Sequence, residues 1–279
     1  MKKTLLILIV QALCLQSFAQ KHETVSDNKT DKMAFSLAFG ASLPEGRFAT
    51  FEYDPATESK FGRNIAGSAA NGYYGKFELN YLIYKHLGLV AMFYASVNNG
   101  VKLTDEQMRS ANYTSGQGGG TVIMTRRNEV NQWRTGGLLI GVYERIGKDR
   151  LHFDFRLTAG LQEVTSPEAK IYEEGYTWIF GTGKTGDLYR TETQQSLLSY
   201  HIVGNAGLDV VYSLSKKMRV KAGIDTFFSK AVFDGYQSYE TTINNTNGTT
   251  EHSESEEYFL FSKYVFILGL NAGISYVIK

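Results

Sequence analysis

Apolar and polar side chains alternate strictly at the C-terminal end of the chain. From residue 266 to 278 every second residue is apolar. The residues between them include Gly269, Asn271, Gly273 and Ser275, which are small or polar. Because successive side chains of a β-strand point to opposite faces, this pattern predicts a strand with one apolar and one polar face. Its length, about twelve residues, is close to what a tilted strand needs to cross a bilayer.

Seven further segments repeat the pattern, and with the C-terminal segment they predict eight strands. The segments cover residues 33–42, 76–83, 87–97, 133–144, 151–162, 198–211 and 218–228. Leu139 breaks the alternation in the fourth of them, and a β-bulge there is one explanation. The predicted fold class is all-β, a single eight-stranded antiparallel transmembrane β-barrel.

The connections between these segments alternate between short turns and long loops. Long structureless loops are uncommon in compact soluble domains. Outer-membrane barrels, in contrast, have short periplasmic turns and long extracellular loops. The pattern therefore favours a barrel in the bacterial outer membrane over a secreted β-sandwich. A ten-stranded barrel remains an alternative if a hairpin of the third loop is embedded. The four long loops are expected at about residues 44–72, 98–132, 163–197 and 229–260.

Aromatic residues near both ends of alternate strands are an independent indication of a membrane barrel. The two members of each pair are 10 to 12 residues apart. For a tilted strand this separation corresponds to roughly 25–30 Å along the membrane normal, the distance between the two aromatic girdles. The predicted membrane-interface residues are Tyr73, Tyr84, Trp133, Tyr143, Tyr200, Tyr212, Tyr264 and Tyr276.

The N-terminus has the features of an export signal. Lys2 and Lys3 precede an apolar run, and Ser17 and Ala19 are the small residues expected before a cleavage site. We therefore expect a signal peptide at residues 1–19, a polar periplasmic leader at residues 20–32 and the barrel domain at residues 33–279. The chain after residue 19 has no cysteine, which excludes disulfides and thiol catalysis. Its charges nearly balance, so nothing indicates a nucleic-acid partner.

Charged residues occupy the polar face of the predicted strands. The interior of an eight-stranded barrel is only wide enough to be filled by side chains. Charges packed there must be paired, because an unpaired buried charge is strongly destabilising. We therefore expect a salt-bridged plug, with a narrow ion pathway as the alternative. The predicted lumen charges are Lys76, Glu78, Arg134, Asp154, Arg156, Asp209, Arg219, Lys221 and Asp225.

Three local motifs have weak functional interpretations. The glycine-rich segment 181–186 is expected to be a hairpin tip rather than a nucleotide site, because no amphipathic helix follows it. The acidic segment 251–257 is expected to be a solvated loop rather than a metal site. Ser199 and His201 are the one pair worth testing for lipid-modifying catalysis, but their face is predicted to point inward, away from lipid. No catalytic residue, cofactor or metal is therefore predicted.

The alternating segments and the C-terminal strand resemble small outer-membrane barrels of the OmpX type, the transmembrane part of OmpA, and the PorT-like barrels. The resemblance covers residues 33–279 and implies insertion by the outer-membrane assembly machinery. The long loops contain aromatic residues suited to protein or glycan contact, so they favour a structural or surface-interaction protein in contact with outer-membrane lipid and lipopolysaccharide. A small pore or a secretion-accessory barrel is the alternative function, and a lipid A-modifying enzyme is a third.

Overall fold

The chain is an all-β protein in a computed structural model that describes residues 33–49, 68–84, 86–102, 119–148, 150–179 and 181–278. Every strand pairing is antiparallel, as predicted. No helix in these residues is long and apolar enough to cross a membrane. The predicted signal peptide (1–19) and leader (20–32) lie outside the described residues. The elements are β1 (Met33–Pro44), η1 (Gly46–Phe48), β2 (Ser68–Tyr84), β3 (Leu87–Val101), β4 (Gly119–Val130), β5 (Gln132–Lys148), β6 (Leu151–Thr165), β7 (Ala169–Ile179), β8 (Gly183–Gln194), β9 (Leu198–Ser213), β10 (Met218–Asn245) and β11 (Thr250–Ile278).

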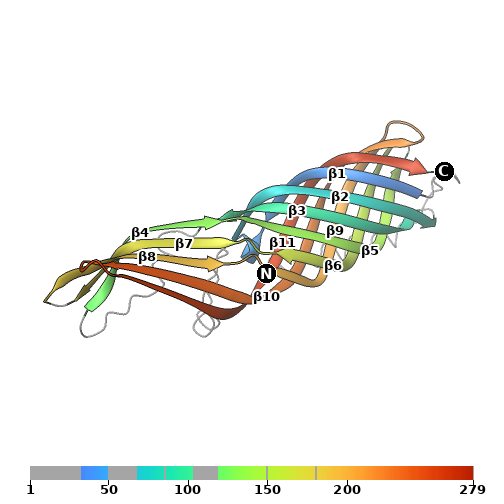
Figure 1. The fold of residues 1–279 in the computed structure, drawn as a ribbon. Helices are drawn as coiled ribbons and strands as arrows, with labels where there is room; N and C mark the ends of the chain where they lie inside the picture. The colour runs from blue at the N-terminus through green and yellow to red at the C-terminus, as the bar shows by residue number, and fades with distance from the viewer. Residues whose placement is uncertain are drawn as a thin grey trace, which may run out of the picture.

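Eight of the strands form a closed ring (Figure 1). They pair in the order β1-β2-β3-β5-β6-β9-β10-β11, and β11 pairs back to β1 from Met33↔Ile278 to Pro44↔Ile267. Short turns join β2 to β3, β5 to β6 and β9 to β10 at the end of the ring where β1 begins and β11 ends. In an outer-membrane barrel this short-turn end is the periplasmic end.

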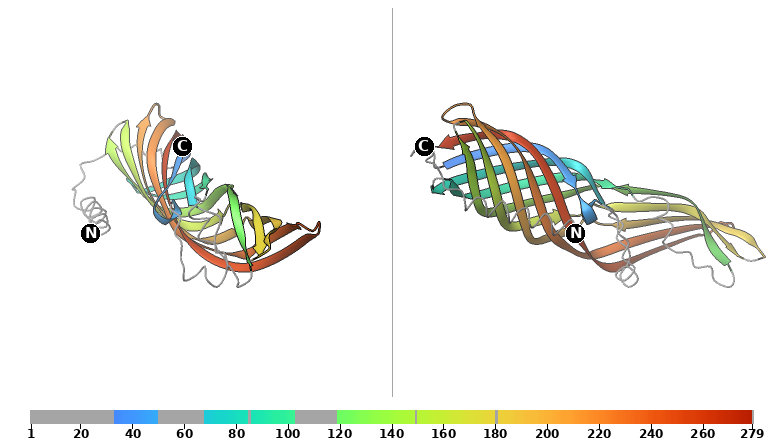
Figure 2. Two further views of the ribbon diagram at one scale, coloured as in Figure 1. Left: turned by 90° about the vertical axis from the view of Figure 1, so that its left-hand side faces the viewer. Right: turned by 180° about the vertical axis from the view of Figure 1, so that it is seen from behind.

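Beyond the other end of the ring, β10 and β11 continue into a second, open sheet. β11 has 29 residues, whereas about 9–11 residues of a tilted strand cross a bilayer. The upper part of β10 pairs with β8, from Gln237↔Gln194 to Asn245↔Gly186, and β8, β7 and β4 pair in that order. We call this part, with residues 237–245 of β10 and 250–257 of β11, the extension sheet. It projects from one side of the barrel, beyond the end of the ring opposite the short turns (Figure 2).

The extension sheet corrects the predicted loops and strand count. β4, β7 and β8 lie within the segments 98–132 and 163–197 that were expected to be loops, and the segment 229–260 is a continuous β-hairpin. The prediction missed these strands because both of their faces are largely polar, so they lack the alternation that lipid imposes. The hairpin of segment 163–197 does not enter the ring of strands, and β8 instead pairs with β10 above it. The glycine-rich segment 181–186 is a hairpin turn as predicted, with positive φ at Gly181 and Gly183.

The barrel wall is apolar outside and polar inside. Outward residues of β5 and β6 include Leu138, Ile140, Leu157 and Leu161, which are 55–69% exposed. Most of their strand neighbours point inward and are buried. Leu139 faces the lumen and is fully buried, and β5 pairs with β3 and β6 without a register shift, so the expected bulge is wrong. An exposed band of large apolar side chains around a closed ring is stable in lipid and unfavourable in water.

A charge placed in this band is expected to destabilise the barrel. Ile140 is 69% exposed and lies between the charged residues Arg134 and Glu144 of the same strand, six residues from the first and four from the second. Ile140→Arg should therefore cost about 2–4 kcal/mol, the range for a lysine or arginine at the bilayer midplane. Urea unfolding in phospholipid vesicles measures this cost. Ser238→Arg, on the same outer surface but in the extension sheet, is the control and should change little. Equal effects of the two changes would contradict the membrane position.

Candidate functional site

Six charged side chains meet in the middle of the lumen. They are Lys76 and Glu78 from β2, Arg156 from β6, Asp209 from β9, and Lys221 and Asp225 from β10. We call them the charge cluster. All six are buried, and three cations face three anions. Strict alternation along each strand brings them to the inner face, because Lys76 and Glu78 are two residues apart on β2, and Lys221 and Asp225 are four apart on β10.

The contacts of the charge cluster cross the lumen. Lys76 Nζ on β2 lies 2.7 Å from Asp225 Oδ2 on β10, and Arg156 Nη2 on β6 lies 2.8 Å from the other oxygen of Asp225. Arg156 also pairs with Glu78 (3.1 Å) and with Asp209. β2 is separated from β9 by half of the ring, so these ion pairs join opposite walls. Such a network spans the lumen at this level.

Neutral donors and glycines complete the charge cluster. The Tyr74 hydroxyl and the Asn271 amide each donate a hydrogen bond to Asp225 Oδ2 at 2.9 Å, and Ser36 donates to Glu78 at 3.2 Å. A Cβ on Gly223 would lie 1.8 Å from Asp209 Oδ1. Glycine is therefore needed at this position because the carboxylate occupies the space. Buried charges are tolerated when they are paired and hydrogen-bonded in this way.

The other three predicted lumen charges lie outside the charge cluster. Asp154 is inside the barrel but pairs with Arg145 Nε at 2.8 Å, a partner that the sequence analysis did not single out. Arg219 is buried on the inward face of β10, as predicted, but lies outside the charge cluster. Arg134 is exposed on the outer surface, so its assignment to the lumen is wrong. The physical reason is strand parity, because Arg134 lies on the same face of β5 as Leu138 and Ile140.

An aromatic layer fills the lumen between the charge cluster and the extension sheet. Tyr94 on β3 stacks on Phe227 on β10, with ring centroids 4.1 Å apart, across the barrel. Above them Trp133 contacts Phe48 edge to face at 5.3 Å and Phe233 at 5.9 Å. Phe48 reaches the lumen because η1 turns inward after β1, with Gly46 at a φ of +57°. This layer was not predicted, although aromatic residues on the polar face of several strands are its signal in the sequence.

Six of the eight predicted interface aromatics point outward. Trp133 and Tyr143 are the exceptions, because they are 0% and 3% exposed and face the lumen. Their positions near the ends of β5 are as expected; the spacing of the aromatics predicts the heights of the rings and not their faces. Tyr264 is flanked by two cations, with Arg47 and Lys230 lying 5.5 and 5.6 Å from its ring centroid. The outward residues are 37–81% exposed and are Tyr73, Tyr84, Tyr200, Tyr212, Tyr264 and Tyr276.

The extension sheet has two unpaired edges among the described residues. β4 pairs only with β7, and the upper half of β11, residues 250–265, pairs only with β10. Residues 250–258 of β11 are all exposed and include Glu251, Glu254, Glu256 and Glu257. An exposed strand edge presents backbone donors and acceptors that can pair with another extended chain. This edge is therefore an exposed and acidic strand edge that could bind a partner.

Two further groups of side chains were considered in the sequence as a metal site and as a catalytic pair. Glu240, His252 and Glu254 are close enough to share a cation, but all three are exposed, and His252 bonds Glu254 and Thr242.

In the lumen, His201 Nε2 lies 3.1 Å from Ser229 Oγ and His201 Nδ1 lies 3.5 Å from Ser199 Oγ. No carboxylate of the described residues hydrogen-bonds His201. A catalytic histidine is normally oriented by such a third group.

The structure is that of a transmembrane β-barrel. A closed ring satisfies every backbone hydrogen bond between strands, and the apolar outer band is suited to lipid. Barrels of this kind reside in the bacterial outer membrane. The predicted outer-membrane location therefore follows from the closed ring and the exposed band.

No protein-family model matches the chain, and no curated protein is similar to it in sequence. Among solved structures, the chain is similar to the attachment invasion locus protein Ail of Yersinia pestis, with 11% identity, a TM-score of 0.38 and coverage of 88% of this chain and 99% of Ail. It is also similar to a major outer-membrane protein of Thermus thermophilus (9% identity, TM-score 0.34, coverage 88% and 99%). A third is the outer-membrane protein OprG of Pseudomonas aeruginosa (9% identity, TM-score 0.28, coverage 90% and 98%). These similarities are loose, so the assignment of a membrane barrel rests on the geometry described above.

Proposed function

We propose that this outer-membrane barrel is a surface-interaction protein that binds extended segments of extracellular macromolecules along its extension sheet. The free edge of β11 is the observation that carries the proposal. A partner strand added there would gain main-chain hydrogen bonds, the mode of binding known as β-augmentation. The row of glutamates favours a basic polypeptide over an acidic one.

The direction of the backbone groups on this edge follows from the register. Glu45 N–H donates to Phe266 O on the β1 side of β11, and Val277 N–H donates to Lys217 O on the opposite side. Backbone groups of an antiparallel strand alternate between its two sides, and β11 pairs with β10 without a register shift. Glu254 and Glu256 therefore present their N–H and C=O groups to the free edge. Ser255 presents its groups to β10.

A proline at Glu256 is expected to block binding without breaking the hairpin. Proline removes the N–H that faces the free edge, and prolines are tolerated at such positions of edge strands. We expect Glu256→Pro to weaken binding of a labelled alternating Lys-Val peptide by about tenfold, the effect of losing one or two hydrogen bonds. Glu256→Gln is the matched control for the charge and should have a smaller effect. The measurement is fluorescence anisotropy on the detergent-folded protein.

The same variants separate the two leading functions in cells. Loss of adhesion with normal secretion supports the surface-interaction role. Loss of secretion with normal adhesion would support the secretion-accessory alternative instead. If Glu256→Pro binds the Lys-Val peptide as tightly as the wild type, the edge of β11 is not the binding surface.

We also propose that the lumen does not conduct ions and that the chain is not an enzyme. The charge cluster and the aromatic layer support a closed lumen, because each of them joins opposite walls of the barrel. The inward position of His201, without a carboxylate partner in the described residues, supports the absence of catalysis on lipid.

A further inference from the structure

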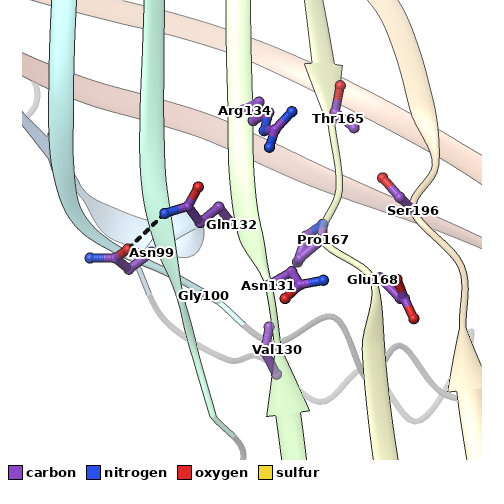
Figure 3. Close-up of a pocket in the computed structure, with 10 residues that line it drawn as sticks. All are labelled: Asn99, Gly100, Val130, Asn131, Gln132, Arg134, Thr165, Pro167, Glu168 and Ser196. Atoms are coloured by element: carbon purple, nitrogen blue, oxygen red, sulfur yellow. Dashed lines mark hydrogen bonds between the residues drawn. The ribbon is translucent and has the colours of Figure 1, made fainter.

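A recess of about 650 Å³ lies outside the barrel, where the ring meets the extension sheet (Figure 3). It forms because the wall strands bend there. β5 begins and β4 ends on either side of Asn131, and the chain leaves strand conformation between β6 and β7 and between β8 and β9. Backbone hydrogen bonds fix the bend, from Asn131 N to Glu168 O (3.0 Å) and from Ser166 N to Leu197 O (2.8 Å). Polar side chains line the recess, among them Asn99, Asn131, Gln132, Arg134, Thr165 and Glu168.

Arg134 is the cation of this recess, and it has no partner among the described residues. Its guanidinium is exposed, and no hydrogen bond or ion pair with a described residue holds it. The nearby carboxylates are engaged elsewhere. Glu168 pairs with Lys170 at 3.0 Å and thereby raises the pKa of Lys170, and Glu163 accepts a hydrogen bond from Tyr200. The recess therefore presents a free guanidinium surrounded by amide and hydroxyl groups.

The height of Arg134 places the recess at the outer surface of the membrane. On β5, Arg134 lies four residues beyond Leu138, the last large apolar residue of the lipid-facing band. Four residues of a tilted strand correspond to roughly 10 Å along the membrane normal, beyond the hydrocarbon core and within the headgroup region. Arg134 of β5 pairs with Val97 of β3, and Val97 in turn pairs with Tyr73 of β2. Tyr73 points outward and is 81% exposed. Aromatic residues of this kind mark the same headgroup level.

We propose that this recess binds the phosphorylated sugar headgroup of an outer-leaflet lipid. A guanidinium binds phosphate in a bidentate manner, more specifically than a lysine does. The amides of Asn99, Asn131 and Gln132 and the hydroxyl of Thr165 supply the donors and acceptors that sugar hydroxyls require. A lipid headgroup is favoured over a soluble sugar phosphate because the recess opens beside the apolar band. The proposal rests on the membrane position but not on strand addition at β11, so the two can fail separately.

The test is native mass spectrometry of the detergent-folded full chain with bis-phosphorylated lipid A. We expect Arg134→Ala to weaken binding by about tenfold or more, the effect of losing a charge-assisted hydrogen bond. Arg134→Lys should recover only part of the affinity, because an ammonium cannot bind in a bidentate manner. Arg150→Ala is the matched control, since Arg150 is an exposed arginine in the turn at the opposite end of the barrel, and it should bind as the wild type does. Heat-dependent gel mobility verifies that each variant is folded.

Two further ligands distinguish the source of the phosphate. Dephosphorylated lipid A should bind at least about tenfold more weakly to the wild type, and that difference should disappear in Arg134→Ala. Glucosamine 1-phosphate tests the soluble alternative, and binding as tight as that of lipid A would overturn the assignment to a lipid. Undiminished binding of lipid A by Arg134→Ala, or no binding by the wild type, would overturn the site itself.

Discussion

Replacing Arg156 by methionine is expected to lower the free energy of unfolding by about 3–5 kcal/mol. Methionine keeps most of the volume of the arginine stem, so the loss is electrostatic rather than a cavity effect. Arg156 is 3% exposed and contacts Glu78, Asp209 and Asp225. Its removal leaves three buried carboxylates with two lysines. A buried charge that loses its partner costs more than the pair contributed. Urea unfolding in phospholipid vesicles, followed by gel mobility, measures the change.

Two controls test the cause of this loss. Arg156→Met/Asp209→Asn leaves two lysines facing two carboxylates, so it should recover part of the lost stability. Arg134→Ala removes an exposed arginine that was also predicted to face the lumen, and it should change the free energy of unfolding by less than about 1 kcal/mol. A double variant less stable than Arg156→Met would contradict the charge-balance explanation. Equal losses for Arg156→Met and Arg134→Ala would contradict the buried position of the charge cluster.

The barrel wall could be predicted because lipid on one side and a polar lumen on the other impose a strict alternation. Each predicted segment lies within a strand of the ring, for example 151–162 within β6 and 198–211 within β9. The extension sheet could not be found in this way. Its strands carry polar residues on both faces, for example Tyr172 and Glu174 on one face of β7 and the buried Glu173 on the other. Hydropathy alternation detects strands with one apolar and one polar face, and it misses strands that carry many polar residues on both faces.

The predictions for Trp133 and Arg134 of β5 are wrong because residue type and strand parity conflict at these two positions. Trp133 was expected at the lipid interface and Arg134 in the lumen, since tryptophan favours interfaces and arginine favours polar interiors. β5 pairs with β6 without a register shift from residue 134 to 148, and Leu138 and Ile140 lie on its outer face. Arg134 must therefore face outward and Trp133 inward. The six members of the charge cluster were found because their strands show no such conflict. Their mutual pairing was not predictable, since it depends on contacts between walls far apart in the sequence.

Trp133→Ala is expected to destabilise the barrel by about 3–5 kcal/mol, the usual cost of truncating a fully buried large aromatic. Trp133 is 0% exposed and packs against Phe48 and Phe233, and Lys263 lies 6.0 Å from its ring. Alanine would leave a cavity in the lumen beside Phe48 and Phe233. β10, which carries Phe233, cannot move in to fill it, because it is paired with β9 and β11. The unfolding free energy in vesicles measures the effect. Lumen conductance should stay absent, because the charge cluster below still joins the two walls.

The matched comparison is Tyr73→Ala, since Tyr73 is an aromatic near the same end of the barrel that is 81% exposed. Both residues were assigned to the membrane interface by the spacing of aromatics along the strands, but only Trp133 is packed inside. We therefore expect Tyr73→Ala to cost clearly less than Trp133→Ala. Equal costs would mean that both rings lie at the lipid interface. Steady channels of nanosiemens size in Trp133→Ala would mean that the aromatic layer alone closes the lumen, and that the charge cluster leaves an ion pathway.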